Sequence, residues 1–167
     1  MAEHRQDEEG GEVPEMTRLD SRQIWVLTIR VGLVAAVLAL AAWILDRPAR
    51  EWGIPASALP GATLALGLGA TVIVPRRRYR RWGYREGADE LEIRRGTLIR
   101  VRTIVPFPRV QHIDVAQGPI QRPFGLATLI LHTAGTHGAA VPLPGLAMAD
   151  AEAMRDRIRG KIREDLA

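Results

Sequence analysis

The 167-residue sequence contains no cysteine, so a disulfide framework, a thiolate zinc site and a thiol nucleophile are excluded. It also lacks a serine nucleophile elbow, a glycine-rich phosphate loop and the HExxH spacing of zinc proteases. Lysine is nearly absent: 22 of the 23 basic residues are Arg, beside abundant Ala and Gly, a bias typical of a GC-rich bacterium. We therefore expect neither an enzyme nor a cofactor.

Charge is distributed unevenly along the chain. Residues 1–20 carry two Arg and seven acidic residues, whereas residues 76–81 carry five Arg and no acidic residue. The net charge of +4 and the hydrophobic fraction of 47% resemble those of a soluble domain only because an apolar half and a polar half average out. Each segment therefore has to be considered separately.

Residues 54–74 form an uncharged run of 21 residues. At about 1.5 Å per residue, such a run makes a helix of roughly 31 Å, which matches the hydrocarbon thickness of a bilayer. Residues 24–45 form another apolar run, which contains Arg30. Arg30 falls about four residues inside the expected boundary, and a guanidinium can reach the headgroups from there. The alternative, an intramembrane charge that serves transport, is less favoured because residues 54–74 offer no acidic partner.

We therefore expect residues 21–75 to form two transmembrane helices. Tryptophan prefers the headgroup layer, and the four tryptophans lie near the ends of both apolar runs, at Trp25, Trp43, Trp52 and Trp82. A cleaved signal peptide is the competing interpretation, but the first run is too long, the preceding tail is acidic and the second run follows at once. Pro60 should kink the second helix, and small residues offer a face for close helix packing, namely Gly61, Gly67 and Gly69.

An arginine run follows the second apolar segment directly, at Arg76, Arg77, Arg78, Arg80 and Arg81. The turn between the two spans carries equal numbers of acidic and basic residues. The positive-inside rule therefore places the C-terminal half in the cytoplasm, and two spans return the N-terminus to the same side. We expect a multi-pass protein of the cell membrane whose residues 1–20 form a disordered acidic cytoplasmic tail.

Residues 76–81 form a basic juxtamembrane segment that can also attract anionic lipid headgroups, at about 1 kcal/mol per basic residue near the surface. Orientation alone is the favoured role. Lipid recruitment that also sets the pose of the following domain is the alternative. Nucleic-acid binding is least favoured because the run adjoins a membrane and no pattern of stacking aromatics follows. Membrane lipids are thus expected partners, and nucleic acid is not.

The pattern changes to short strands in residues 82–167. Leu91 and Ile93 alternate with Glu92 and Arg94, and Gly96 marks a hairpin turn into the next strand. Near the C-terminus, apolar residues recur at spacings of three or four and predict an amphipathic helix, at Ala147, Ala151, Met154, Ile158 and Ile162. About six antiparallel strands closed by this helix make an α+β domain.

Residues 105–129, "VPFPRVQHIDVAQGPIQRPFGLATL", resemble the YdbS-like bacterial pleckstrin-homology (PH) domain family. The family signature, V-P-x-x-R-[IV]-Q-x-[IV]-D-V-x-Q-G-P followed by F-G-L-A-T-L, falls here on Val105, Pro106, Arg109, Val110, Gln111, Ile113, Asp114, Val115, Gln117, Gly118, Pro119 and Phe124 to Leu129. The resemblance covers residues 80–165, and the family's preceding pair of membrane helices matches residues 24–74. It implies a membrane-anchored α+β fold, in which a two-helix transmembrane hairpin precedes a PH-like split β-barrel with a C-terminal helix. It implies no established chemistry.

Most residues of this signature are expected to have a role in forming the fold. Pro106 and Pro108 remove donors from a strand ladder and suit an edge or a bend. Gly118 and Pro119 predict a turn. Phe124 is the expected large core residue.

Four arginines flank the Gly96 turn and form a candidate anion site, namely Arg94, Arg95, Arg100 and Arg102. They look similar to the basic pair of eukaryotic phosphoinositide-binding PH domains, and their guanidinium groups suit bidentate phosphate contacts. The favoured alternative is the solvated face of an alternating strand. His112 and Asp114 lie two residues apart on one strand face, with His132 and His137 elsewhere, so three convergent metal ligands are not indicated and no metal is expected.

These expectations favour a non-enzymatic integral membrane protein. It would display a cytoplasmic PH-like domain, residues 82–167, for protein interaction or self-assembly at the membrane. Its partners would be lipids and either further copies of itself or other membrane proteins. The alternative function is a PH-like domain that senses anionic lipid through the candidate anion site.

Overall fold

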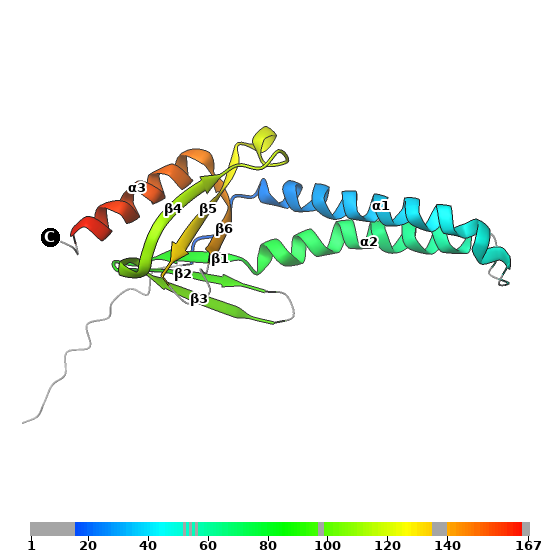
Figure 1. The fold of residues 1–167 in the computed structure, drawn as a ribbon, viewed down its shortest axis with the longest axis horizontal. Helices are drawn as coiled ribbons and strands as arrows, with labels where there is room; N and C mark the ends of the chain where they lie inside the picture. The colour runs from blue at the N-terminus through cyan, green and yellow to red at the C-terminus, as the bar shows by residue number, and fades with distance from the viewer. Residues whose placement is uncertain are drawn as a thin grey trace, which may run out of the picture.

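The computed structural model describes residues 16–51, 53, 55, 57–96, 99–134 and 140–164. Two antiparallel helices form a long arm that projects from a domain of strands and one helix (Figure 1). The arm consists of α1 (Gln23–Glu51) and α2 (Ala58–Arg80). The domain consists of β1 (Gly83–Glu86), β2 (Glu90–Arg95), β3 (Val101–Pro106), η1 (Phe107–Arg109), β4 (Val110–Ala116), η2 (Arg122–Phe124), β5 (Leu126–Thr133), β6 (Ala140–Ala147) and α3 (Met148–Glu164).

The arm leaves its apolar side chains on the outside. Only 11% of the most apolar window of α1 and 6% of that of α2 is buried inside the protein. A core helix of a soluble protein would bury a much larger share, since burial of apolar area is what stabilises it. With 29 and 23 residues, the two helices extend roughly 43 Å and 34 Å, enough to cross the hydrocarbon layer.

The helix bounds differ from the predicted spans at their outer ends. α1 continues beyond residue 45 to Glu51, and α2 begins at Ala58 instead of residue 54. Pro60 therefore lies in the first turn of α2, where its missing N–H has no helical acceptor and no kink is needed. Trp25 and Trp43 are exposed on α1, whereas Trp82 packs against the domain core. Trp52 lies outside the described residues.

One of the three predicted packing glycines lies at the helix contact. A Cβ atom on Gly67 would come within 2.9 Å of the Ala35 Cβ, so α1 and α2 approach closely at this point. Gly61 and Gly69 have no such neighbour within 4 Å. The prediction of a small-residue contact is thus confirmed for Gly67 and is wrong for the other two.

Two antiparallel sheets, β1-β2-β3 and β4-β5-β6, share one core with α3. Leu91 and Ile93 of β2 face inward, as their alternation predicts, and belong to the same buried core as Leu129 and Leu131 of β5. The predicted stripe of α3 covers this core through Ala151, Met154 and Ile158, all buried. Among the described residues, strand pairing stays within each sheet. The two sheets and the C-terminal helix agree with the fold that the resemblance implied, without strand pairing that closes the split barrel.

The large aromatic residue of the core is Phe107, which is completely buried in η1. Phe124, the predicted core residue, is only partly buried in η2. Each lies in a short 3-10 helix beside a proline, but only Phe107 is fully buried. As predicted, Pro106 ends the edge strand β3. Gly118 begins the turn to η2, accepting a hydrogen bond from the Gln121 amide.

The segment before α1 is part of the domain. Leu19 is buried in its core, and Thr17 pairs with Tyr84 of β1. The Tyr79 hydroxyl, near the end of α2, donates to the Leu19 carbonyl at 2.8 Å. Residues 16–20, which were predicted to belong to the acidic tail, therefore connect the domain to both helices. Residues 1–15 of that tail lie outside the described residues.

Candidate functional site

The arginine run lies where the arm meets the domain. Arg76, Arg77, Arg78 and Arg80 occupy the last turns of α2, and Arg81 caps the helix. All five side chains are exposed. Positive charge at a helix C-terminus is favourable because the backbone dipole is negative there. The predicted juxtamembrane segment is thus a continuation of the second apolar helix.

The hairpin of β2 and β3 lies beside this end of α2. A groove of about 460 Å³ opens near its tip, and we call it the basic groove; its lining is Arg81, Arg94, Arg95, Gly96, Arg100, Val101 and Arg102. A second cavity of about 400 Å³ shares Arg95 and extends to Arg78 and Trp82. The candidate anion site and the end of the arginine run, predicted separately, therefore form one continuous surface.

Glu92 lies under three arginines on the outer face of β2. Arg94 and Arg102 each bring Nε to 2.6 Å from Glu92 Oε1, and Arg85 pairs with Oε2. The Glu92 side chain is only 1% exposed, whereas those of Arg94 and Arg102 remain 50% and 55% exposed. Two arginines of the candidate anion site are thus held by a carboxylate of the same chain and still present half of their surface to solvent.

The electrostatics of this cluster favour the ionised form of Glu92 at neutral pH. Burial raises the pKa of Glu92, but hydrogen bonds from Arg94 and Arg102 and the charge of Arg85 outweigh it, so its pKa lies below the ordinary 4.5. Arginine stays charged at any physiological pH. Three arginines around one carboxylate leave the cluster with a net charge of +2. The basic groove therefore keeps a positive field while two of its arginines are held in place.

The tip of the hairpin is apolar as well as basic. Ile99 is 77% exposed, between Gly96 and Arg100. Gly96 has φ of 121°, and a Cβ atom there would come within 1.8 Å of the Ile99 carbonyl oxygen, so only glycine suits this turn. An exposed isoleucine beside several arginines is the combination that suits a lipid interface, where apolar groups insert and cations meet headgroups.

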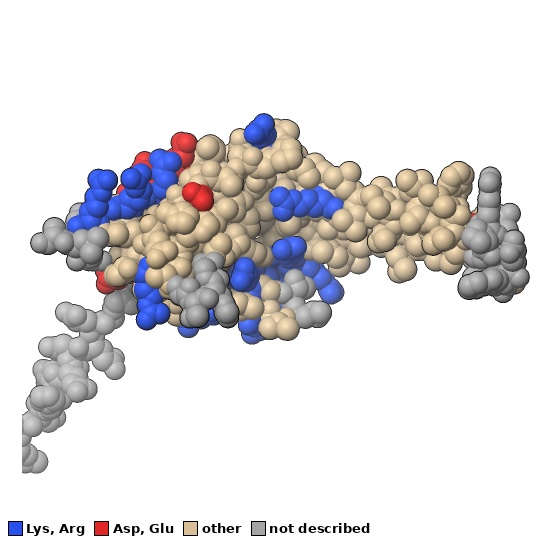
Figure 2. Space-filling model, viewed as in Figure 1, with Lys and Arg blue, Asp and Glu red and all other residues tan. Residues whose placement is uncertain are grey.

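Basic side chains gather over the domain and at the root of the arm. Figure 2 shows them there, whereas the middle of the arm shows no basic or acidic side chains on the face in view. This division matches the sequence, in which charge is sparse between residues 31 and 75 and dense after it. The boundary between the two surfaces marks where a headgroup layer would lie.

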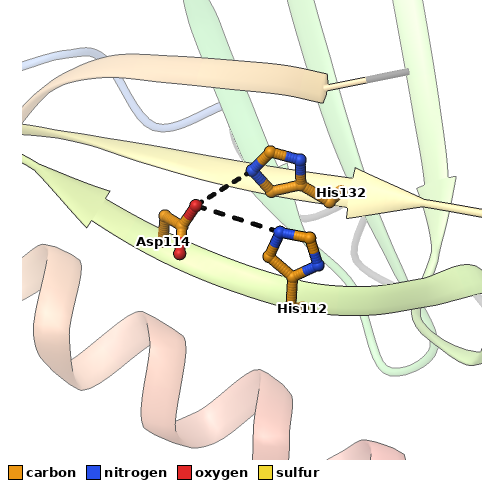
Figure 3. Close-up of side chains that lie close together, drawn as sticks. All are labelled: His112, Asp114 and His132. Carbon is orange, nitrogen blue, oxygen red and sulfur yellow. Dashed lines mark hydrogen bonds and ion pairs between the residues drawn. The ribbon is translucent and has the colours of Figure 1, made fainter. Parts of the chain in front are cut away.

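A second polar cluster brings together residues that were not predicted to converge. His112 and Asp114 of β4 and His132 of β5 converge on the outer face of their sheet (Figure 3). Because β4 and β5 pair with His112 opposite His132, the antiparallel register brings the two imidazoles together. The expectation that no three metal ligands converge is therefore wrong. Spacing along the sequence does not reveal this register. His137 lies outside the described residues.

Comparison with known proteins agrees with these features. The family model described as Bacterial PH domain matches residues 24–162, which include both helices of the arm. The chain is 34% identical over 141 residues to UPF0699 transmembrane protein YdbS of Bacillus subtilis (strain 168), a match that covers 83% of this chain and 86% of that protein. No solved structure is significantly similar to it. The predicted resemblance is confirmed: the chain is a YdbS-like membrane protein and belongs to the bacterial PH domain family.

Proposed function

We propose that this chain is a non-enzymatic, multi-pass membrane protein that presents its PH-like domain to other proteins at the cytoplasmic face of the cell membrane. This domain consists of residues 82–167, completed by residues 16–20. The two helices of the arm cross the bilayer, and both termini lie in the cytoplasm. The arginine run sets this orientation, since it is the densest positive segment and adjoins the second span.

The observation that carries this proposal is the set of contacts that attaches the domain to both helices of the arm. We call this region the joint. Leu19 lies in the domain core before α1 begins, and Tyr79 near the end of α2 donates to the Leu19 carbonyl. The Asp20 amide donates to the Gly145 carbonyl at 2.8 Å. A domain fixed at both helices keeps one pose relative to the bilayer, and a fixed pose suits a protein that presents an interaction surface.

The surface that best suits a protein partner is the outer edge of β3. This strand is the last of its sheet, so its edge can pair with a strand from a partner. It also exposes Val101 and Ile104, two apolar side chains on a domain whose other described strands bury most of theirs. We expect a second copy of the chain or another membrane protein to bind there.

Site-specific photocrosslinking in intact membranes tests this surface. A photoreactive amino acid at Ile104 should give an adduct of discrete size, because the partner would lie against β3. The same amino acid at Ala153, exposed on α3, is the matched control and should give none. Equal adducts at both positions, or none at Ile104, would contradict the proposal. Amine crosslinkers are unsuitable for this surface, since the single lysine, Lys161, lies on α3 and not on β3.

A second candidate function is sensing of anionic lipid, which the exposed Ile99 beside the basic groove favours. Part of the candidate anion site is occupied by Glu92, so we assign headgroup contact chiefly to Arg95 and Arg100. Arginines of the run, Arg76 to Arg81, would hold headgroups next to them. Such contacts give about 1 kcal/mol per basic residue near an anionic surface.

This candidate requires the whole chain for its test, because residues 82–167 alone lack Leu19 of the core. The absence of cysteine allows a single environment-sensitive label at Ile99→Cys in proteoliposomes. Its emission should shift to the blue in anionic vesicles relative to zwitterionic ones, and Arg95→Ala/Arg100→Ala should remove the shift. A label at Ala153→Cys is the control. Identical spectra in both vesicle types would exclude lipid sensing by the hairpin.

A further inference from the structure

The outer face of the sheet β4-β5-β6 carries a cluster that neither proposed function uses. His112 and Asp114 project from β4, and His132 projects from β5 beside them (Figure 3). His132 Nε2 lies 3.1 Å from Asp114 Oδ2, and His112 Nε2 lies 3.9 Å from the same oxygen. One ligand atom from each residue lies within 4.8 Å of the other two.

These separations are close to those of a metal site. Bonds of about 2.0–2.1 Å in a tetrahedron place neighbouring ligand atoms roughly 3.4 Å apart. Two imidazole nitrogens and one carboxylate oxygen are the ligands that Zn²⁺ and its neighbours in the first transition row accept, whereas Ca²⁺ and Mg²⁺ require mainly oxygen. We propose that His112, Asp114 and His132 bind a divalent late transition metal ion such as Zn²⁺, with a coordination position left for water.

Coordination, and not net charge, would have to provide the affinity. Arg159 and Arg163 of α3 line a cavity of about 290 Å³ next to His112, and their charges repel a cation. Hard cations that depend on negative charge are therefore disfavoured at this place. A late transition ion gains instead from coordinate bonds to imidazole nitrogen.

Binding requires the two rings to turn. The imidazoles of His112 and His132 are stacked, with centroids 3.9 Å apart and planes inclined by 14°, and a metal ion must lie in the plane of each ring. His112 and Asp114 are exposed and His132 is partly exposed, so side-chain rotation has room. The backbone register of β4 and β5 already brings the three ligands together, and only side-chain angles have to change.

Calorimetric titration of the full chain in detergent tests the site. The protein is purified with a tag that contains no histidine and is freed of metal with a chelator before Zn²⁺ is added. We expect one ion per chain. His112→Ala and His132→Ala should each weaken binding more than about tenfold, since even changes around metal ligands cost 10- to 100-fold.

The chain offers a matched control, because it contains only four histidines and no cysteine. His4→Ala/His137→Ala removes the two histidines outside the cluster and should leave Zn²⁺ binding unchanged. Co²⁺ should give the visible absorption bands of a low-symmetry site, and these should disappear in His132→Ala. Circular dichroism checks that each variant keeps its fold. Absence of stoichiometric binding, or equal affinity in all variants, would overturn the proposal.

Discussion

Glu92 shows how one residue changes the character of a surface. By strand alternation it should be a solvated side chain opposite Leu91 and Ile93. Three arginines from three strands cover it instead, and it is among the most buried residues of the described chain. Arg94 and Arg102 consequently have fixed positions at the rim of the basic groove, and the groove has a smaller charge than its arginines alone would give.

Replacing this carboxylate should destabilise the domain in a pH-dependent way. At neutral pH, Glu92→Gln should lower the free energy of unfolding by about 1.5–3 kcal/mol, the usual range for hydrogen bonds to charged groups. The lowered pKa of Glu92 means that its contribution is complete above the ordinary 4.5 and is lost as the pH falls through the folded-state value. Wild type and variant should therefore differ in melting temperature at pH 7 and converge in acid.

Thermal unfolding of the full chain in detergent, followed by circular dichroism at several pH values, measures this difference. Glu152→Gln, on the exposed face of α3, is the control and should melt like the wild type at every pH. A Glu92→Gln variant with an unchanged melting temperature at pH 7 would show that the arginine cluster does not stabilise the domain.

For individual residues, the sequence predicted spatial proximity only where the residues are also close along the chain. Arg94, Arg95, Arg100 and Arg102 flank one turn, so their proximity follows from the Gly96 hairpin. His112 and His132 are twenty residues apart, and their contact depends on the register of β4 and β5. The choice between Phe107 and Phe124 as core residue depends on the direction in which each bend turns, which hydrophobicity alone does not encode.

Among the elements, the helices of the arm pack through small residues. Lipid tails are as apolar as leucine, so helices in a bilayer associate by close van der Waals contact and not by hydrophobic burial. Gly67 allows α2 to approach Ala35 of α1. Gly69, two residues further along the same helix, has open space around it.

Gly67→Ala should therefore weaken the arm, whereas Gly69→Ala should not. Both substitutions improve helix propensity to a similar extent, so their difference isolates the contact. The new methyl group at residue 67 overpacks the contact, which typically costs about 1–3 kcal/mol, and lowers the melting temperature in detergent. Adding Ala35→Gly to Gly67→Ala should restore the stability by exchanging the methyl group between helices. Equal melting of Gly67→Ala and Gly69→Ala would refute this contact.

The type and order of the elements were largely predictable, because their hydrophobic periods differ. Continuous apolar runs predicted the arm, alternation predicted strands such as β2, and spacings of three or four predicted α3. The start of α2 and the place of residues 16–20 were not predictable. Leu19 is one apolar residue in a polar segment, and only the three-dimensional arrangement shows that it completes the core.

In the whole molecule, the joint fixes where the basic groove lies. Arg78 at the end of α2 lines one cavity with Arg95 and Val101, so the hairpin of β2 and β3 lies beside the root of the arm (Figure 1). If the arm spans the bilayer in the proposed orientation, the groove and Ile99 lie at its cytoplasmic surface, while β3 and the face of β4 and β5 remain accessible to partners and ions. Both proposed functions therefore depend on the same placement in the membrane, whereas the metal site depends only on the register of β4 and β5.

Cysteine accessibility in spheroplasts tests that placement most directly. The chain has no cysteine, so Pro55→Cys in the turn between α1 and α2 and Ala153→Cys on α3 each provide one reactive thiol. A membrane-impermeant maleimide should label Pro55→Cys in intact spheroplasts and Ala153→Cys only after permeabilisation. Labelling of Ala153→Cys from outside intact spheroplasts, or recovery of the full chain in the soluble fraction without detergent, would contradict the account.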